Sequence, residues 1–557
     1  MVINTEGPAE KAGHSNAPYV LVFHRMSIPK IPDIPDEERT PLVVFLLEVI
    51  RLQQEQIQAL RDEIAILKGE KPRPKIKPSK LDSGTGTPDN DRDNDKGKRP
   101  GSAKRSKLGE IEIHETVVLK AESVPPGSTF KGYEDYTVQD IVLKAHNVLY
   151  RRERWQTPGG ESMIAPLPQE VQTLNGGHFE HSLNAFVLYQ YHHAQVTQPL
   201  ILEQLRELGI DISAGQVNRI ITEDHDELHD EKDELLRAGL EVSGHVNVDD
   251  TGARHKGKNG YCTHIGNELF AWFQSTESKS RTNFLELLRA GQTNYVLNAE
   301  AIEYMRRNKL PQAQLQRLIA DDQWFVNEAE WMAALAARDI TKKWHIRIAT
   351  EGALLASVLA NGINPELVII SDDAGQFNVL LHGLCWIHAE RTINKLVGFN
   401  DEQRKALEAS RTQIWDFYQE LKAYRENPSA EQKPALEARF DEIFTTRTCF
   451  VTLNQALKRL HNNKSELLLV LERPDIPLHN NTSEGDIREY VKRRKISGGT
   501  RSELGRRCRD TFASLKKTCR KLGLSFWQFL NDRLCNTGSI APLPELIRQR
   551  AAEAEPS

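Results

Sequence analysis

The chain has 557 residues, 27% of them charged, and a formal net charge of −5. This length predicts several domains, and the composition is that of an ordinary folded protein rather than a fibrous or largely disordered one. No stretch approaches the roughly 18 consecutive apolar residues that predict a membrane-spanning helix, and the apolar patch at residues 19–23 is too short for a secretory signal.

The six cysteines are scattered along the chain and form no Cys-x-x-Cys pair. This spacing fits a reduced, cytoplasmic protein better than a disulfide or zinc-ribbon scaffold. We therefore expect a cytoplasmic protein whose cysteines are free thiols.

The N-terminal part is predicted to hold a dimerisation element. Residues 1–40 are punctuated by prolines and are predicted to be disordered, with Met26 as an alternative translation start. Residues 41–68 carry a heptad pattern, with one core position occupied by Val43, Ile50, Ile57 and Ile64 and the other by Leu46, Gln53, Leu60 and Leu67. β-Branched residues at the first position with Leu at the second favour a parallel two-stranded coiled coil. A single amphipathic helix packed on its own domain gives the same pattern.

The next two segments differ in composition. Residues 69–109 are rich in Lys, Pro, Gly, Asp and Ser and are predicted to form a disordered linker. Residues 110–170 carry short alternating runs that predict a small β module, with a DNA-contact role for Arg151, Arg152 and Arg154. Because no cysteine precedes Cys262, no zinc site is expected in this module.

Residues 171–240 are predicted to be helical. Residues 198–226 follow a helix, tight turn, helix pattern in which Ser213 is a plausible N-cap. This is the pattern of a helix-turn-helix whose second helix enters a major groove, and an ordinary αα-hairpin gives it equally well. The acidic continuation at residues 223–234 would repel phosphate and disfavours groove reading.

Two strands that end in acidic pairs organise the rest of the chain. Residues 244–251 alternate polar and apolar side chains up to Asp249, and the runs 261–266 and 268–275 follow, separated by a Gly-Asn hairpin signal. The apolar run 367–370 leads into Asp372. A carboxylate at a strand tip is well placed for chemistry, although Asp372 is equally explained as the cap of a following helix.

A distant acid completes the pattern. Glu484 lies near the start of a predicted helix that continues into a basic run at residues 486–495. Such a position suits either a surface acid favoured by the helix dipole or a metal ligand.

Three segments, VDDTGAR, ISDDAGQF with CWIHAER, and NNTSEGDIREYVKRRK, resemble the acidic motifs of transposases of the insertion-sequence-66 family. Carried over by position, Asp249, Asp372 and Glu484 are that family's catalytic, metal-binding Asp-Asp-Glu triad. Asp250 stands where the family usually has Glu, and His479 where an Asp commonly precedes the Asn pair.

The resemblance implies an α/β fold with a ribonuclease-H-like catalytic core at residues 241–500. The long helical section between the acidic strands contains an apparent insertion at about residues 294–345. A basic helical region at residues 501–540 and a tail at 541–557 complete the chain.

The resemblance also implies the reaction. It predicts DNA cleavage at transposon ends followed by strand transfer into target DNA, with two Mg²⁺ or Mn²⁺ ions held by the three carboxylates. The expected partners are double-stranded DNA, a second copy of the chain through the coiled coil, and accessory proteins of the same bacterial element. The alternative is a catalytically inactive DNA-binding relic that keeps the fold.

Basic residues concentrate after Glu484. Between Arg488 and Lys521 there are 13 Lys or Arg residues against 3 acids. Arg488, Lys492 and Lys495 recur at helical spacing and, with the adjacent Arg493 and Arg494, are predicted to contact DNA. A solvated basic face is the alternative.

Further residues are predicted to support the site: Cys385, His388, Arg391, Asn480 and Asn481. Cys385 and His388 match a Cys-x-x-His signature of the family, for which we expect a structural role because no second ligand pair is visible nearby. His388 or Arg391 beside the scissile phosphate is the alternative. Asp250 and Asp373 are rival ligands, which strand alternation places on the opposite faces.

Overall fold

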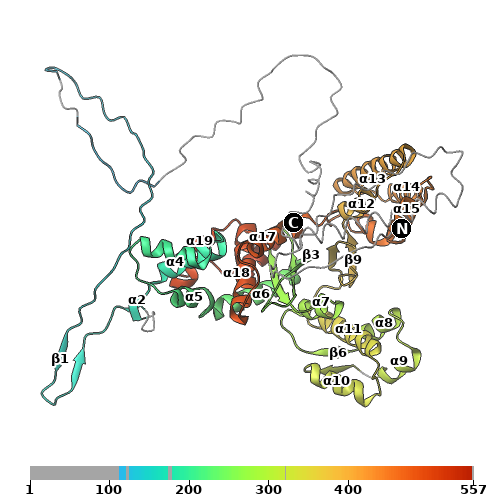
Figure 1. Ribbon diagram of the computed structural model, residues 1–557, viewed down its shortest axis with the longest axis horizontal. Helices are drawn as coiled ribbons and strands as arrows, with labels where there is room; N and C mark the ends of the chain where they lie inside the picture. The colour runs from blue at the N-terminus through green and yellow to red at the C-terminus, as the bar shows by residue number, and fades with distance from the viewer. Residues whose placement is uncertain (1–111, 121–124, 173–177, 320–321, 555–557) are drawn as a thin grey trace, which may run out of the picture. The chain divides into compact units, whose positions relative to one another are not determined.

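The computed structural model describes residues 112–120, 125–172, 178–319 and 322–554 (Figure 1). The chain divides into two units, residues 1–138 and 139–557. The predicted N-terminal disordered segment, coiled coil and linker, residues 1–109, lie outside the described residues. The described residues of the first unit are exposed and hold neither helix nor strand. The elements below all belong to the second unit.

A five-stranded sheet of order β5-β4-β3-β8-β9 positions the acidic strands. β3 (His245–Gly252), β4 (Tyr261–Gly266) and β5 (Ala271–Thr276) form an antiparallel meander. β8 (Val368–Ser371) pairs with β3 in parallel, and β9 (Leu381–Leu384) pairs with β8 in parallel. The predicted α/β class and the predicted strands around both acidic pairs are thus confirmed.

The apolar run before the second acidic pair is explained by burial of both faces of β8. Ile369 packs into one hydrophobic core with the meander and the first helices, whereas Val368 and Ile370 pack into a second core. A strand that is buried on both faces has apolar side chains on each face, so its sequence is a continuous apolar run rather than an alternating one.

The edge strand β5 is covered by α18 (Glu503–Lys521). Three β5 backbone N–H groups donate to α18 side chains: Ala271 to the Thr518 hydroxyl at 3.1 Å, Phe273 to the Ser514 hydroxyl at 2.9 Å, and Ser275 to the Asp510 carboxylate at 2.7 Å. Residues four apart on a helix face one way, and alternate strand residues expose their N–H groups on one edge. The helix therefore closes an edge that would otherwise be free to pair.

Helices precede the sheet. They are α2 (Gln169–Gln172), α3 (His181–Leu188), a π-helical turn η2 (Tyr189–His193), α4 (Gln198–Glu207), α5 (Ala214–Thr222) and α6 (Asp226–Val242). The predicted helix, turn, helix is present as α4 and α5, and the predicted N-cap is confirmed, because the Ser213 hydroxyl accepts from the Gln216 N–H at 3.1 Å.

The described part of residues 110–170 holds one two-stranded antiparallel sheet, β1 (Arg154–Gln156) and β2 (Ser162–Ile164). Two of its arginines brace the hairpin: Arg152 donates to the Ala165 carbonyl at 2.6 Å and Arg154 to the Ser162 hydroxyl at 2.9 Å.

The chain between β5 and β8 forms the first insertion. Its elements are α7 (Arg281–Leu288), β6 (Tyr295–Leu297), α8 (Ala299–Arg307), α9 (Gln312–Leu318), β7 (Gln323–Phe325), α10 (Glu328–Ala337) and α11 (Lys343–Ala360). The sequence predicted helices here, and the antiparallel pair β6–β7 was not expected. Strands of three residues are too short for a period of two to be legible.

A second insertion follows β9, and the sequence did not single it out. It comprises α12 (Trp386–Asn394), α13 (Asp401–Glu426), α14 (Lys433–Thr445), α15 (Val451–Asn462), α16 (Lys464–Leu467) and η3 (Leu469–Leu471), with α12–α15 drawn in orange in Figure 1. Its core includes Trp386, Phe417 and Phe440, together with the second face of β8.

The chain then returns to the sheet through α17 (Asn481–Ser497), which packs on β3 and β4. Gly498 ends this helix at φ +67°, a conformation that glycine adopts without steric cost. After α18 come α19 (Phe526–Cys535), which packs on α3, and α20 (Leu543–Ala554), which packs on α6. None of the helices in the described residues is long and apolar enough to cross a bilayer.

Candidate active site

The two acidic strands bring their carboxylates to one edge of the sheet. β3 and β8 are parallel neighbours with Asn247 opposite Ile370, and the same register two residues further along sets Asp249 beside Asp372. The carboxyl ends of parallel neighbours meet at the same edge of a sheet, which explains why two segments more than a hundred residues apart meet here.

The start of α17 is fixed against these strands by buried hydrogen bonds. The Asn480 amide donates to the Val248 carbonyl at 2.8 Å and accepts from the Asn247 amide at 2.9 Å. One turn later, the Ser483 hydroxyl bonds the ring of His264, on β4, at 2.7 Å. These contacts flank Glu484 and hold it at the acidic edge of the sheet.

The negative charges of Asp372, Asp250 and Glu484 act on Asp249. Burial, together with these charges, raises the pKa of Asp249 to about 7 against one backbone hydrogen bond from Asp250. Neighbouring negative charges disfavour the ionised form of a carboxyl group. β3, the end of β8 and α17 therefore place the three sequence-predicted acids within electrostatic reach of one another.

Asp372 does not cap a helix. The residues between β8 and β9 form turns, so the alternative interpretation of Asp372 as a helix cap is wrong. One carboxylate oxygen accepts from the Ala374 N–H at 3.2 Å and so holds the turn.

The rival acids are engaged elsewhere. Asp250 accepts from the Thr263 hydroxyl at 2.5 Å through one oxygen and from the Gln376 amide at 3.1 Å through the other. Asp373 is exposed and pairs with Arg459. Both rival carboxylates thus have hydrogen-bond or ion-pair partners of their own.

Glu484 is only 16% exposed and is surrounded by nitrogen donors. Its carboxylate lies 3.1 Å from Arg391, 3.5 Å from the ring of His388 and 3.6 Å from Arg488. Burial lowers the pKa of His388, against the opposing charge of Glu484, so the ring is neutral at pH 7. Two predicted supporting residues, His388 and Arg391, therefore lie beside the third acid.

Cys385 and Asn480 have positioning contacts. The buried Cys385 sulfur accepts from the Asn480 backbone N–H at 3.2 Å, and burial raises the pKa of this thiol to about 11. A protonated thiol is neither a good nucleophile nor a metal ligand, which agrees with the structural role expected for Cys385. Asn481 is the first residue of α17.

The predicted DNA-contacting residues separate into two groups. Arg488, Lys492 and Lys495 are exposed along α17. Arg493 is buried, with its guanidinium 3.7 Å from the centre of the Tyr191 ring, and Arg494 is half-buried and donates to the Thr251 hydroxyl at 3.3 Å. Lys492 and Lys495 are exposed to a DNA backbone, Arg488 is exposed but lies 3.6 Å from Glu484, and Arg493 and Arg494 contact the protein itself.

Part of the basic run faces inward. Lys517 and Lys521 of α18 lie 3.4 Å and 2.9 Å from Asp486, and Lys516 and Lys517 lie 2.5 Å and 2.7 Å from Glu489. The surplus of positive charge counted in the sequence is therefore partly used to join α17 to α18.

The donor set at the acidic edge suits a hard divalent cation. Three carboxylates on separate elements supply oxygen ligands of the kind that Mg²⁺ and Mn²⁺ prefer, and the raised pKa of Asp249 marks unneutralised negative charge. Within the described ranges, no group of three or more His, Cys, Asp or Glu side chains is already arranged around a cation position. Of the three acids, Glu484 is ion-paired with Arg391.

Residues 363–507 match the family described as "Transposase IS66 family". The chain belongs to this family. The matched region begins just before β8 and ends at the start of α18, so it contains Asp372 and Glu484. A similar relative is "Uncharacterized protein y4jO" of Sinorhizobium fredii (strain NBRC 101917 / NGR234), 44% identical over 321 residues, which are 57% of this chain and 100% of the relative.

Membership in the Transposase IS66 family gives the chain a transposase role and implies a DNA partner and the use of divalent metal. Three residues that hold the acidic edge were not predicted: the buried Asn247 and His264, and the half-buried Gln376. Asn247 and His264 are polar residues within strands whose neighbouring residues are buried, and this pattern in the sequence could have indicated them. Gln376, in a turn, carried no such signal.

Proposed function

We propose that this protein is a transposase of the Asp-Asp-Glu type that cleaves DNA at transposon ends and joins the freed ends to target DNA. Asp249, Asp372 and Glu484 are proposed as the catalytic acids that hold two divalent ions. The observation that carries the proposal is the meeting of these three carboxylates, from β3, the end of β8 and α17, in an environment that raises the pKa of Asp249 to about 7.

The sheet order supports a ribonuclease-H-like core. An antiparallel meander is followed by two parallel strands, with the first acid on the opening strand, the second after β8 and the third on a later helix. This is the arrangement that the family resemblance led us to expect. The two insertions enlarge the core without interrupting a strand.

The chain's own residues have defined tasks in this proposal. When bound, two Mg²⁺ or Mn²⁺ ions activate a water molecule and neutralise the charge on the phosphate and the leaving oxygen. Glu484, with Asp249 and Asp372, would hold the ions, and the Arg391 guanidinium, 3.1 Å from Glu484, is placed to bind a DNA phosphate. Asn480 keeps α17 in register with β3 throughout. Because ions activate the nucleophile, no protein thiol or hydroxyl is required.

DNA contacts outside the acidic edge are proposed for the exposed cations Arg488, Lys492 and Lys495. They continue along the helix that carries Glu484, so a strand whose scissile phosphate reaches the acids passes these side chains. Neutralising them should weaken binding to all sequences and reduce its salt dependence.

The decisive test is Mg²⁺-dependent cleavage and joining of labelled DNA that carries the ends flanking the gene. Wild type is compared with Asp249→Asn, Asp372→Asn and Glu484→Gln, and DNA binding is measured in parallel. We expect each variant to lose at least about a thousandfold in rate while binding persists, because each removes a carboxylate that binds metal.

Asp373→Asn is the matched control. It removes an exposed carboxylate next to Asp372 and should leave the rate unchanged. Normal cleavage by the triad variants would reject the assignment of the acids. A wild-type protein that binds these ends but never cuts them would identify the inactive relic.

A further inference from the structure

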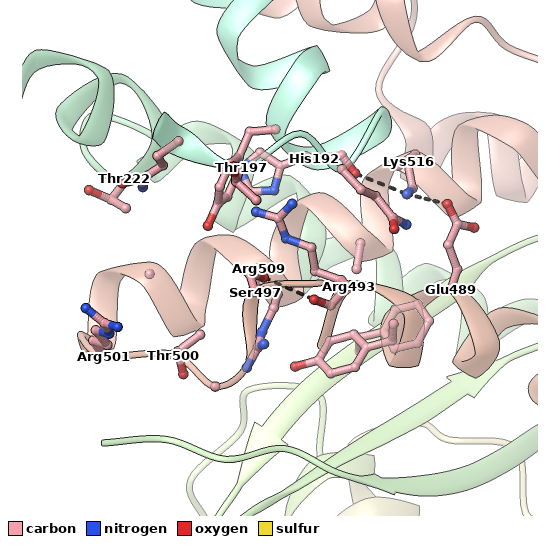
Figure 2. Close-up of a pocket in the computed structure, with 18 of the residues that line it drawn as sticks. His192, Thr197, Thr222, Glu489, Arg493, Ser497, Thr500, Arg501, Arg509 and Lys516 are labelled. Carbon is pink, nitrogen blue, oxygen red and sulfur yellow. Dashed lines mark hydrogen bonds and ion pairs between the residues drawn. The ribbon is translucent and has the colours of Figure 1, made fainter. Parts of the chain in front are cut away.

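A cavity of about 470 Å³ lies on the other side of α17 from the acidic edge. Figure 2 shows side chains that line it. Its walls come from η2, α4, α5, α17 and the start of α18. Arg493 lines the cavity and lies nine residues after Glu484 on α17. Nine residues are two and a half helical turns, so the two side chains lie on opposite faces of the helix, roughly 14 Å apart along its axis. The cavity is therefore distinct from the proposed catalytic site.

The charges lining this cavity do not balance. Its two lysines, Lys516 and Lys517, are paired with its two carboxylates, Glu489 and Asp486. Three lining arginines remain, Arg493, Arg501 and Arg509, and no carboxylate of the described residues pairs with any of them. Figure 2 shows all three among the lining side chains.

Two of these guanidinium groups are buried with unused donors. Arg493 is 8% exposed and Arg509 is 9% exposed, and the Nη2 of the first and the Nε of the second have no hydrogen-bond partner. Tyrosine rings help to orient them: Arg493 lies 3.7 Å from the Tyr191 ring centre and Arg509 lies 5.2 Å from that of Tyr490. Burying a charge without a counter-ion costs several kcal/mol, so such an arrangement calls for an anion.

Another feature of the cavity favours negative charge. The N-terminus of the 19-residue helix α18 borders it through Ser502 and Gly505, and a helix N-terminus carries partial positive charge.

We propose that this cavity binds a phosphate group, carried either by a DNA strand or by a free nucleotide. The planar guanidinium group of arginine donates two parallel hydrogen bonds that match a pair of phosphate oxygens. Three such groups in one cavity favour a phosphate over an apolar ligand. The tyrosine rings beside the guanidinium groups give a base or sugar an apolar wall. The proposal does not depend on the Asp-Asp-Glu assignment.

The test measures binding and needs neither metal nor cleavage. Full-length protein is titrated calorimetrically at low ionic strength with dAMP, inorganic phosphate and deoxyadenosine, and its affinity for duplex DNA is measured over a range of salt concentrations. Arg493→Gln, Arg509→Gln and Arg501→Gln are compared with wild type. Arg501 is exposed at the cavity wall, so its replacement leaves the fold intact.

Arg289→Gln is the matched control. Arg289 is 9% exposed and lies 4.9 Å from the Tyr295 ring centre, but it is outside the cavity. We expect dAMP and phosphate, but not deoxyadenosine, to bind wild type and the control, with affinity at least about tenfold weaker in the three cavity variants.

In a second outcome, the free ligands do not bind, and the cavity variants alone lose affinity for DNA. If the slope of their log affinity against log salt concentration also falls by about one unit, the phosphate belongs to a DNA strand. If neither the free ligands nor DNA distinguishes the cavity variants from Arg289→Gln, the proposal is overturned.

Discussion

The two faces of α17 carry opposite kinds of unbalanced charge. On one face Glu484 meets Asp249 and Asp372, and on the other Arg493 meets two further arginines. Between them Asp486 and Glu489 are fully paired with lysines of α18. Buried charges that balance one another join elements of the fold, whereas buried charges of one sign mark places that a ligand completes.

The largest effect should come from breaking the balanced pairs. Burial alone would raise the pKa of Asp486, but His264 and Lys521 hold it well below its ordinary value. Asp486→Ala leaves the largely buried Lys521 without a carboxylate partner and leaves Lys517 with Glu489 alone, so we expect the free energy of unfolding to fall by about 3–5 kcal/mol. Urea denaturation measures this, with the exposed Asp373→Ala as control. Equal stability of the two variants would show that the pairs are not structural.

A smaller effect of opposite sign is expected at the unbalanced acidic face. Asp249→Asn removes one of several crowded negative charges while its Oδ1 still accepts the Asp250 N–H, a bond of 2.7 Å. We expect the free energy of unfolding of metal-free protein to rise by roughly 2 kcal/mol at pH 8. Thermal melts with and without Mg²⁺ check this. Destabilisation of the metal-free variant would contradict the charge crowding inferred for this face.

The smallest effect is expected at His229, a buried side chain that stays neutral and therefore needs no counter-ion. Burial, followed by the charge of Arg507, lowers the pKa of His229 from 6.5 to about 4, and its ring bonds the Thr511 hydroxyl at 2.7 Å. The unfolded state then binds more protons than the folded state between these values. We expect stability on the order of 1 kcal/mol to be present above pH 6.5 and lost as the pH falls through 4. His229→Gln should flatten this part of the urea-derived pH profile, and an unchanged slope would exclude His229 as its source.

The sequence predicted the sheet well because its strands carry strong local signals. Alternation up to Asp249, the Gly-Asn turn and the apolar run before Asp372 are each contained within a few residues, and each predicted strand is present. The triad was predicted from motifs, and the approach of its first two acids follows from parallel pairing of β3 with β8.

What the sequence did not reveal depends on contacts between distant segments. A count of Lys and Arg cannot tell that Lys517 and Lys521 face Asp486 while Arg488 faces solvent, because all lie on basic helices. The cavity around Arg493 is built from segments some three hundred residues apart, such as Tyr191 and Arg509, and no local pattern records that proximity.

The wide spacing of the three acids along the chain has a consequence for the timing of synthesis. Asp249 leaves the ribosome 235 residues before Glu484. At about 5–20 residues per second, that interval lasts roughly 10–50 s, during which the first two strands exist without the helix that brings the third acid. A partly made chain therefore holds an incomplete site throughout this window, and the cleavage proposed above would have to await nearly the whole of the sheet-bearing unit.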